Sequence, residues 1–270
     1  MERKTGRKIK NNIFLVIAIL VMLGFGVAFA YHSYGYFLWW RDGQSAEENT
    51  RIVREIFAEK IGLLTALSTE AETAVFSNTS PVSTTRELTK NLDIIAFIHI
   101  EGTNISNVVM QGDNNDFYLY HDMFGTPNVN GSVFMDFRNS PDFTDKNTII
   151  YGHNMRNGTM FHNLRYYLTR DFFEAHPLIK IFTDTKVLIY EIFSTFSTHV
   201  DFEYIQVHFN SDKEFGGLIG EIMRRRAFDT GIAARRDDRL LILSTCTNVD
   251  EDTRFVVAAR LTQTISIIRP

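Results

Sequence analysis

Residues 239–261 read RLLILSTCTNVDEDTRFVVAARL, and the rest of the chain is organised around this stretch. Four apolar residues, Leu240 to Leu243, predict a short buried strand that leads directly into Cys246. After a polar loop, Arg254 opens a second strand that continues to Leu261. The simplest connection is an antiparallel hairpin with Cys246 and Arg254 at its mouth, where facing Cα atoms lie about 4.5 to 5.5 Å apart. The thiol and the guanidinium are therefore predicted to be neighbours.

The chain before this hairpin carries the same β pattern. Short runs rich in β-branched and aromatic residues occur at 94–100, 108–111, 117–120, 132–137, 148–151, 178–182 and 187–197. Turn signals separate these runs, and no glycine-rich phosphate loop or internal repeat interrupts them. The seven runs and the closing hairpin predict a mainly β domain, a mostly antiparallel barrel or sandwich rather than a βαβ fold.

Two amphipathic helices are predicted beside the strands. Residues 42–67 repeat apolar side chains at helical spacing behind a capping box of Ser45 and Glu48. A second capping box, Ser211 with Glu214, opens a helix before the cysteine strand. This later helix either covers an open side of the barrel or forms part of the wall of a substrate groove.

The N-terminus predicts a membrane anchor. Five Lys or Arg residues against one Glu precede an uncharged apolar run at 13–31, which is long enough to cross a bilayer. A positive flank stays on the cytoplasmic side, so the remainder of the chain is expected outside the cell. Ala28 and Ala30 also form an A-x-A pattern that suits a cleaved signal peptide. An uncleaved anchor is favoured because the apolar run exceeds a usual signal core, and Trp39 and Trp40 follow it like an interface belt.

An extracellular location changes how the single cysteine is interpreted. A free cysteine is commonly a small, inert core residue, and Arg254 is then an ordinary surface charge. Cys246 is the only cysteine, so it cannot form an intramolecular disulfide in an oxidising environment. A single exposed thiol is prone to oxidation, and its presence is more easily explained by a chemical role.

A thiol nucleophile needs a nearby base or imidazolium, because free cysteine has a pKa of about 8.5. Among the eight histidines, His153 has the most suitable position. It follows a buried run and Gly152 and precedes a polar loop, so it lies at a strand exit, as Cys246 does. Catalytic groups commonly occupy such loop edges on a rigid sheet.

Composition and motif spacing argue against several other functions. The net charge of −4 gives no basic surface that would favour nucleic acid. One cysteine with scattered histidines, and no CxxC or HExxH motif, makes a poor zinc site. The acidic loop at 250–252 lacks a calcium-loop pattern. No metal and no cofactor is therefore expected.

Taken together, the anchor, His153 within YGHNM, LSTC ending at Cys246, and Arg254 resemble a class B sortase. GTNI, VVMQGDN, FYLYHD and GSVFMDFRN, within residues 102–139, are similar to the same family. The resemblance covers about residues 42–261. One departure is Ile242, which stands where the family's TLxTC motif begins with Thr.

The resemblance implies an eight-stranded sortase β-barrel with N-terminal helices and a helix before the cysteine strand. The implied organisation is a cytoplasmic basic tail at 1–12, a transmembrane anchor at 13–31, juxtamembrane and N-terminal helices at 32–92, and a catalytic barrel at 93–270. It also implies a single-pass membrane protein of a Gram-positive-type cell, with the catalytic domain outside.

The implied reaction is cysteine transpeptidation. Cys246 attacks the Thr carbonyl of a C-terminal sorting motif on a secreted protein, and a peptidoglycan amine resolves the thioacyl enzyme. His153 serves as acid and then as base, and Arg254 holds the substrate and the developing oxyanion. The family match further suggests substrate-binding residues that line the peptide cleft: Asn115, Leu119, Tyr204, Ile205, Ser244 and Thr245.

Two alternatives remain open at this level. One is a secreted cysteine peptidase, in which water replaces the amine. The other is a catalytically silent, membrane-tethered binding domain, against which the presence of all three of His153, Cys246 and Arg254 argues. The sorting motif, the acceptor amine and the choice between protein anchoring and pilus polymerisation are not encoded in any recognisable stretch.

Overall fold

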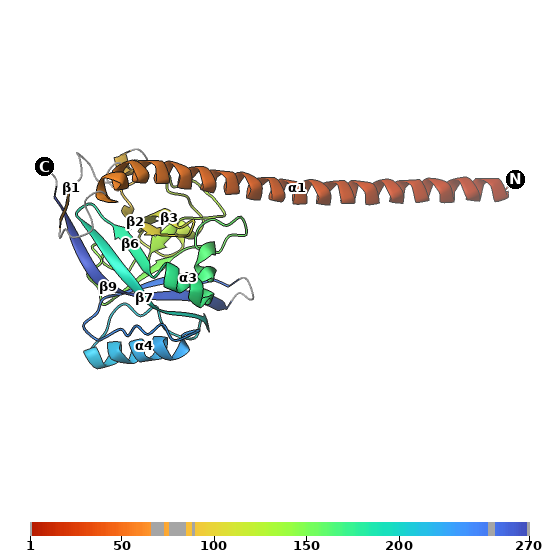
Figure 1. The fold of residues 1–270 in the computed structure, drawn as a ribbon. Coiled ribbons are helices and arrows are strands. Elements are labelled where there is room, and N and C mark those ends of the chain that lie inside the picture. The colour runs from red at the N-terminus through yellow and green to blue at the C-terminus, as the bar shows by residue number, and fades with distance from the viewer. Residues whose placement is uncertain (1, 66–72, 76–84, 88–89, 248–251, 269–270) are drawn as a thin grey trace. The chain divides into compact units, whose positions relative to one another are not determined.

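The structure is a computed structural model that describes residues 2–65, 73–75, 85–87, 90–247 and 252–268 (Figure 1). The chain forms two compact units, residues 1–44 and residues 45–270. Helix α1 (Glu2–Thr65) supplies the first unit and begins the second. Within it, Leu15–Val53 is long and apolar enough to cross a membrane.

The prediction that a separate helix begins at residue 42 is wrong. The structure has one helix through this region, so Ser45 is an interior helical residue and not an N-cap. Glu48 instead accepts two hydrogen bonds from Arg51, which also bonds Glu55 one turn later. Ala46 and Val53 of the same helix are buried in the core of the second unit.

The second unit is a closed β-barrel with added helices, which confirms the predicted fold class. The strands are β1 (Thr73–Val75), β2 (Ile94–Ile100), β3 (Ser106–Met110), β4 (Val133–Met135), β5 (Asn147–Tyr151), β6 (Leu178–Phe182), β7 (Lys186–His199), β8 (Leu240–Cys246) and β9 (Thr253–Ile268). Eight of them form a ring in the order β9, β7, β6, β2, β3, β4, β5, β8, and β8 pairs with β9 to close it. Strand β1 adds to the end of β9 in parallel. Most pairs are antiparallel, but β3 with β4 and β5 with β8 are parallel.

One predicted strand is a helical turn. Residues 117–120 contain the 3₁₀ helix η1 (Phe117–Leu119). The Asn114 side chain accepts hydrogen bonds from the backbone N–H groups of Asp116 and Phe117, and this local bonding turns the chain before an extended strand can form. Strand β9 also continues well past its predicted end at Leu261.

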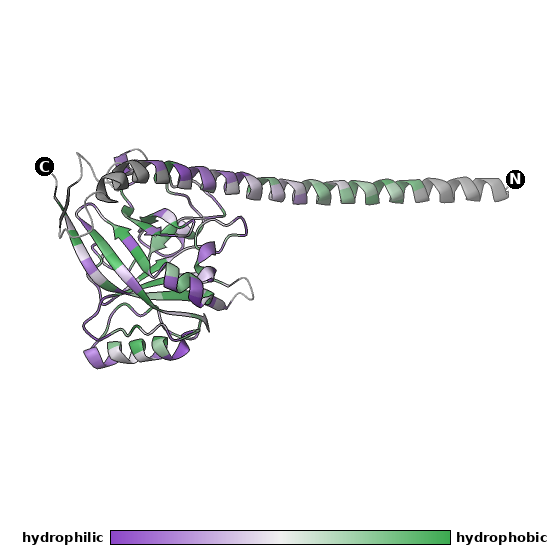
Figure 2. Cartoon of the chain, viewed as in Figure 1, coloured by the Kyte–Doolittle hydropathy of each residue, from purple (hydrophilic) through white to green (hydrophobic). Residues whose placement is uncertain are grey.

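The two sides of the strands bury different clusters. Alternate residues of β5, β8 and β9 point into the barrel, where Leu241, Leu243 and Val257 are fully buried. The intervening residues, such as Ile242, point outward and are covered by α4 (Asp212–Arg225). Figure 2 shows apolar residues along the strands and alternating with polar ones on α4.

The cap of α4 is the one predicted from the sequence. The Ser211 side chain accepts a hydrogen bond from the Glu214 backbone N–H, and Glu214 in turn accepts from the backbone of Asn210. Four residues of the helix are buried against the barrel: Phe215, Leu218, Ile219 and Ile222. Two further helical segments, η2 (His162–Leu168) and α3 (Arg170–Ala175), lie between β5 and β6 in the chain.

Candidate active site

Cys246 is the last residue of β8, and its direct cross-strand partner is Arg254 of β9. The predicted hairpin register is therefore confirmed. Since Leu241 and Leu243 point into the barrel, the alternation of β8 turns Ser244 and Cys246 toward the outer face. Facing residues of an antiparallel pair project to the same side, so Arg254 stands on that outer face with the thiol.

His153 reaches the same edge from β5. Strands β5 and β8 are parallel, and Tyr151 is paired with Ser244. His153 lies two residues after Tyr151, and Cys246 lies two residues after Ser244. Both therefore lie at the same end of the sheet, on strands about 4.8 Å apart. The Asn154 side chain fastens the two exits, because its Nδ2 donates to the Cys246 carbonyl at 2.8 Å. The three predicted catalytic residues thus come from three adjacent strands or their ends.

A carbonyl group orients the imidazole of His153. Its Nε2 lies 2.8 Å from the carbonyl oxygen of Leu119, and since a carbonyl only accepts, Nε2 carries a proton. In the neutral ring Nδ1 is then the nitrogen able to accept one. Gly131 abuts the same carbonyl: it has a φ of +56°, and a Cβ built there would lie 2.5 Å from the Leu119 oxygen.

A pocket of about 320 Å³ surrounds these groups and is called the Cys246 pocket below. All nine predicted site residues line it: Asn115, Leu119, His153, Tyr204, Ile205, Ser244, Thr245, Cys246 and Arg254. Its first wall comes from residues 115–119 and its second from residues 200–205, between β7 and α4. The segment before α4 therefore supplies the wall, and α4 itself covers the barrel.

The second wall is tied to the cysteine strand by a tyrosine. Tyr204 is buried, and its hydroxyl lies 2.8 Å from Ser244 Oγ. Burial raises the pKa of Tyr204, although the Ser244 hydrogen bond and the nearby Arg254 charge oppose this shift. The phenol is therefore neutral at physiological pH and holds residues 200–205 against β8.

The sequence interpretation missed several residues at this site. The pocket is also lined by Asp116, Phe134, Tyr151, Gly152, Val200 and Phe202. Tyr151 could have been found, because it is the last residue of β5 and lies two residues before His153. No such signal marked Asn154 or His162. His162 Nδ1 lies 2.9 Å from Asn154 Oδ1.

No group of three His, Cys, Asp or Glu side chains arranged to hold a metal ion occurs within the described parts of the chain. The arrangement offers a thiol, an imidazole and a guanidinium beside a pocket with polar and aromatic walls. Such a set suits covalent catalysis by sulfur on an extended peptide, with a cation placed to stabilise negative charge.

The chain is similar to known proteins of one family. The pattern that defines the Sortase domain family matches residues 98–262. Sortase B of Listeria monocytogenes is 37% identical over 179 residues, which cover 65% of this chain and 73% of that protein. Sortase B of Staphylococcus aureus is 34% identical over 175 residues, which cover 63% of this chain and 71% of the relative.

Solved structures agree with these matches. The Staphylococcus aureus sortase B–substrate complex aligns with a TM-score of 0.69 at 26% identity, covering 82% of this chain and 98% of that one. Clostridium perfringens sortase B aligns with a TM-score of 0.63 at 33% identity, covering 67% of this chain and all of the other.

Proposed function

Because the chain belongs to the sortase family, we propose that Cys246, His153 and Arg254 carry out its cysteine transpeptidation of sorting signals. The observation that supports these roles is the register of three strands. Cys246 faces Arg254 directly, and His153 leaves the neighbouring parallel strand at the same end, in one pocket. A cysteine that served only packing would need neither partner.

In the first half-reaction the Cys246 thiol gives its proton to Nδ1 of His153, and the resulting thiolate attacks the carbonyl carbon of the substrate threonine. A C–S bond forms, and the electron pair moves to the carbonyl oxygen beside the guanidinium of Arg254. One well-placed donor of this kind contributes about 3 to 4 kcal/mol to lowering such a barrier. When the tetrahedral intermediate collapses, the C–N bond breaks and His153 gives its proton to the leaving amine.

In the second half-reaction an amine replaces the leaving group. The incoming nitrogen attacks the thioacyl carbon, and His153 takes up the proton that the nitrogen loses. Collapse then expels the Cys246 thiolate and leaves a new amide bond. Together the two half-reactions exchange one amide bond for another, so no oxidant or energy source is required.

The peptide is expected to lie between the two walls of the Cys246 pocket. Asn115 and Leu119 contact it from one side, and Tyr204 and Ile205 from the other, with Ser244 and Thr245 near the reacting carbonyl. Sortase B of Staphylococcus aureus, whose fold is similar, forms a complex with a substrate, which supports substrate binding by this fold.

The proposal extends to the acceptor and the location. The acceptor is a peptidoglycan precursor amine, and the donor is a secreted protein that ends in a sorting motif. The apolar part of α1 holds the enzyme in the membrane. Its N-terminal Lys and Arg residues lie on the cytoplasmic side, and the barrel lies outside.

The test uses the full chain in detergent micelles and a panel of peptides with Pro- and Thr-containing sorting motifs. Mass spectrometry should find a thioacyl adduct on Cys246, and added amine should convert it to an amide product. A thiol-reactive probe should label the wild-type protein faster than a His153→Ala variant, because the imidazole activates the thiol. Equal labelling rates and no adduct with any peptide would refute the proposal. Hydrolysis that no amine diverts would instead assign the protein as a peptidase.

A further inference from the structure

We infer that the ion pair of the buried Asp136 with the partly exposed Arg138 positions both walls of the Cys246 pocket and thereby sets its affinity for the peptide. This inference rests on the proposed function of that pocket. Neither residue lines the pocket, and no motif around them pointed to a role there.

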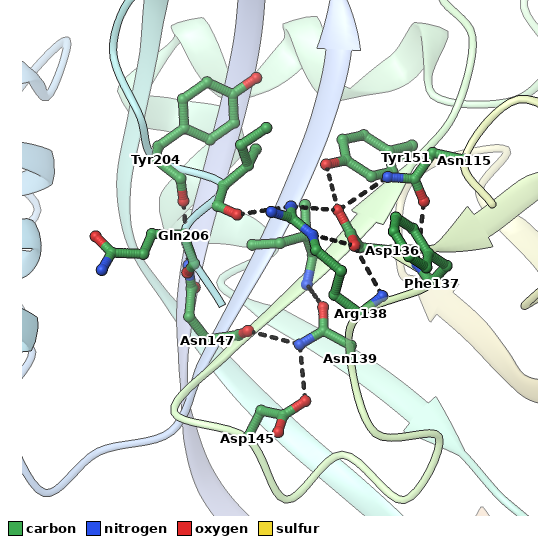
Figure 3. A network of polar contacts seen from close by, with 12 residues as sticks. Asn115, Asp136, Phe137, Arg138, Asn139, Asp145, Asn147, Tyr151, Tyr204 and Gln206 are labelled. Carbon is green, nitrogen blue, oxygen red and sulfur yellow. Dashed lines mark hydrogen bonds and ion pairs between the residues drawn. The ribbon is translucent and has the colours of Figure 1, made fainter. Parts of the chain in front are cut away.

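Asp136 follows β4, and its side chain is completely buried. Both carboxylate oxygens are used. Oδ1 accepts from the backbone N and the Nε of Arg138 at 3.0 and 2.8 Å. Oδ2 accepts from an Arg138 terminal nitrogen at 2.7 Å, from Tyr151 Oη at 2.9 Å and from Asn115 Nδ2 at 3.1 Å. Figure 3 shows these side chains converging on the carboxylate from separate parts of the fold.

Asp136 is an anion despite its burial. Desolvation alone would raise the pKa of this carboxyl, but the hydrogen bonds from Arg138 and Tyr151 outweigh it and hold the pKa below the usual value. Burial raises the pKa of Tyr151 strongly, and the Asp136 charge adds to the shift, so the phenol stays protonated and donates. The carboxylate therefore acts as the common acceptor for groups that do line the pocket.

The first wall is fixed through Asn115. Its Nδ2 donates to Asp136, and its Oδ1 accepts from the Phe137 backbone N–H at 3.0 Å. With both ends engaged, the amide is held in one orientation. One N–H of Nδ2 and one lone pair of Oδ1 remain available, so a donor and an acceptor are presented together, as the backbone of an extended peptide requires.

The second wall is fixed through Arg138. Its guanidinium, which also holds Asp136, donates to the carbonyl of Ile205 at 3.0 Å. The residues on either side of Ile205 are held by β5, because Asn147 Nδ2 donates to the carbonyls of Tyr204 and Gln206 at 3.1 and 2.8 Å. One ion pair therefore connects the 115–119 segment with the 200–205 segment. The width of the cleft between them depends on that connection.

The closing experiment measures KM and kcat of the full chain in micelles with a sorting peptide that the wild type cleaves. Asp136→Asn keeps the side-chain volume but removes the charge, and it turns an amide NH₂ toward groups that are themselves donors. KM should rise about 10- to 100-fold with a smaller change in kcat, since Asp136 bonds Asn115 and not the Leu119 carbonyl that orients His153. Labelling of Cys246 by iodoacetamide, which needs no cleft, should stay within about twofold of the wild type.

Two further variants keep the inference falsifiable. Arg138→Lys keeps the charge on a partly exposed residue but loses the forked link to Ile205, so KM should rise about 3- to 10-fold. Glu191→Gln is the matched control, because it breaks a partly buried ion pair with Arg260 that joins β7 to β9 and does not line the pocket. Its KM should match that of the wild type.

The outcomes separate the two proposals. If the wild type forms no acyl adduct with any peptide, the proposed function fails. A second outcome is that the wild type is active and that Asp136→Asn and Arg138→Lys have the same KM as the control Glu191→Gln. The proposed function then stands, and this inference is overturned. A fall in iodoacetamide labelling equal to the fall in kcat/KM would also overturn it, because the pair would then support the fold and not the cleft.

Discussion

Strands β5, β8 and β9 have two faces that differ in how their ends are covered. On the barrel side, apolar residues run close to the strand ends, and Leu243, Phe255 and Val257 are at most 4% exposed. On the other side, α4 and its flanking segments cover Leu240 and Ile242, and the cover then stops.

The groups left uncovered are the chemically active ones. Beyond the cover, the outer face presents Tyr151 and Cys246 from β5 and β8, with Arg254 opposite the thiol, while Ser244 between them is buried under Tyr204. The same backbone thus serves two purposes: one face supplies stability through packing, and the other supplies a pocket held together by hydrogen bonds. Substitutions on the two faces should therefore separate stability from activity.

The largest expected effect is on the uncovered face. Cys246→Ala should lower amide transfer by at least about 10⁴-fold, because the covalent intermediate cannot form. The free energy of unfolding should change by less than about 1 kcal/mol, since the thiol is only partly buried. Product formation by mass spectrometry and chemical denaturation measure the two quantities. Residual transfer at a tenth of the wild-type rate would contradict the assignment of Cys246 as nucleophile.

The inner face should respond in the opposite way. Leu243→Ala, one residue before the pocket, should cost about 2 to 5 kcal/mol of unfolding free energy through the cavity it leaves. Ser244→Ala is the matched control on the next residue, and it loses one hydrogen bond to Tyr204, worth about 1 kcal/mol. Denaturant titration of both variants checks the contrast. Equal losses would mean that the two faces are not distinct in their contribution to stability.

A glycine offers a more subtle way to disturb only the pocket side. Gly131→Ala would place a Cβ against the Leu119 carbonyl that orients His153, and kcat/KM should fall about 100-fold from this displacement. Gly125→Ala is the control, because Gly125 has a φ of +75° but open space around its missing Cβ. It should show a similar backbone penalty of about 1 kcal/mol with unchanged kinetics. Equal kinetics in both variants would show that the carbonyl does not orient the imidazole.

The smallest expected effect is a dependence of stability on pH. Burial, with a contribution from Arg165, lowers the pKa of His162, the residue behind Asn154 and the Cys246 carbonyl. As the pH falls below about 6.5, His162 binds a proton in the unfolded chain but is still neutral in the folded chain. The free energy of unfolding therefore decreases. His162→Asn should remove this part of the slope. Denaturation of both proteins between about pH 7.5 and about pH 5.5 measures it, and parallel slopes would contradict it.

Much of the barrel could be predicted because its strands follow a period of two. Strands β2 and β6 have the predicted limits, and the hairpin register followed from a strand, a polar loop and a strand. The edge shared by His153 and Cys246 followed from two strand exits of the same kind. In each case the signal is local, since a run of apolar residues and the polar residue after it are adjacent in the sequence.

The parts that were missed depend on partners distant in the chain. Asp136, in MDFRN, resembles an ordinary polar residue at a strand end, and its burial follows from Asn115 and Tyr151, which belong to other segments. The turn at η1 depends on the Asn114 side chain, which outweighs the aromatic composition of residues 117–119. Strand β1 has only three residues, too few for a periodic pattern, and β9 provides its pairing partner from the opposite end of the chain.

That last pairing has a practical consequence for shortening the protein. Thr73, Ala74 and Val75 supply the backbone partners for residues 266–268 on one side of β9, while Lys186 to His199 of β7 occupy the other side. A truncated version that begins after residue 75 would leave the tip of β9 as an unprotected edge, which invites association with other strands. A soluble fragment for crystallisation should therefore begin upstream of Thr73, even though the whole pocket lies downstream of it.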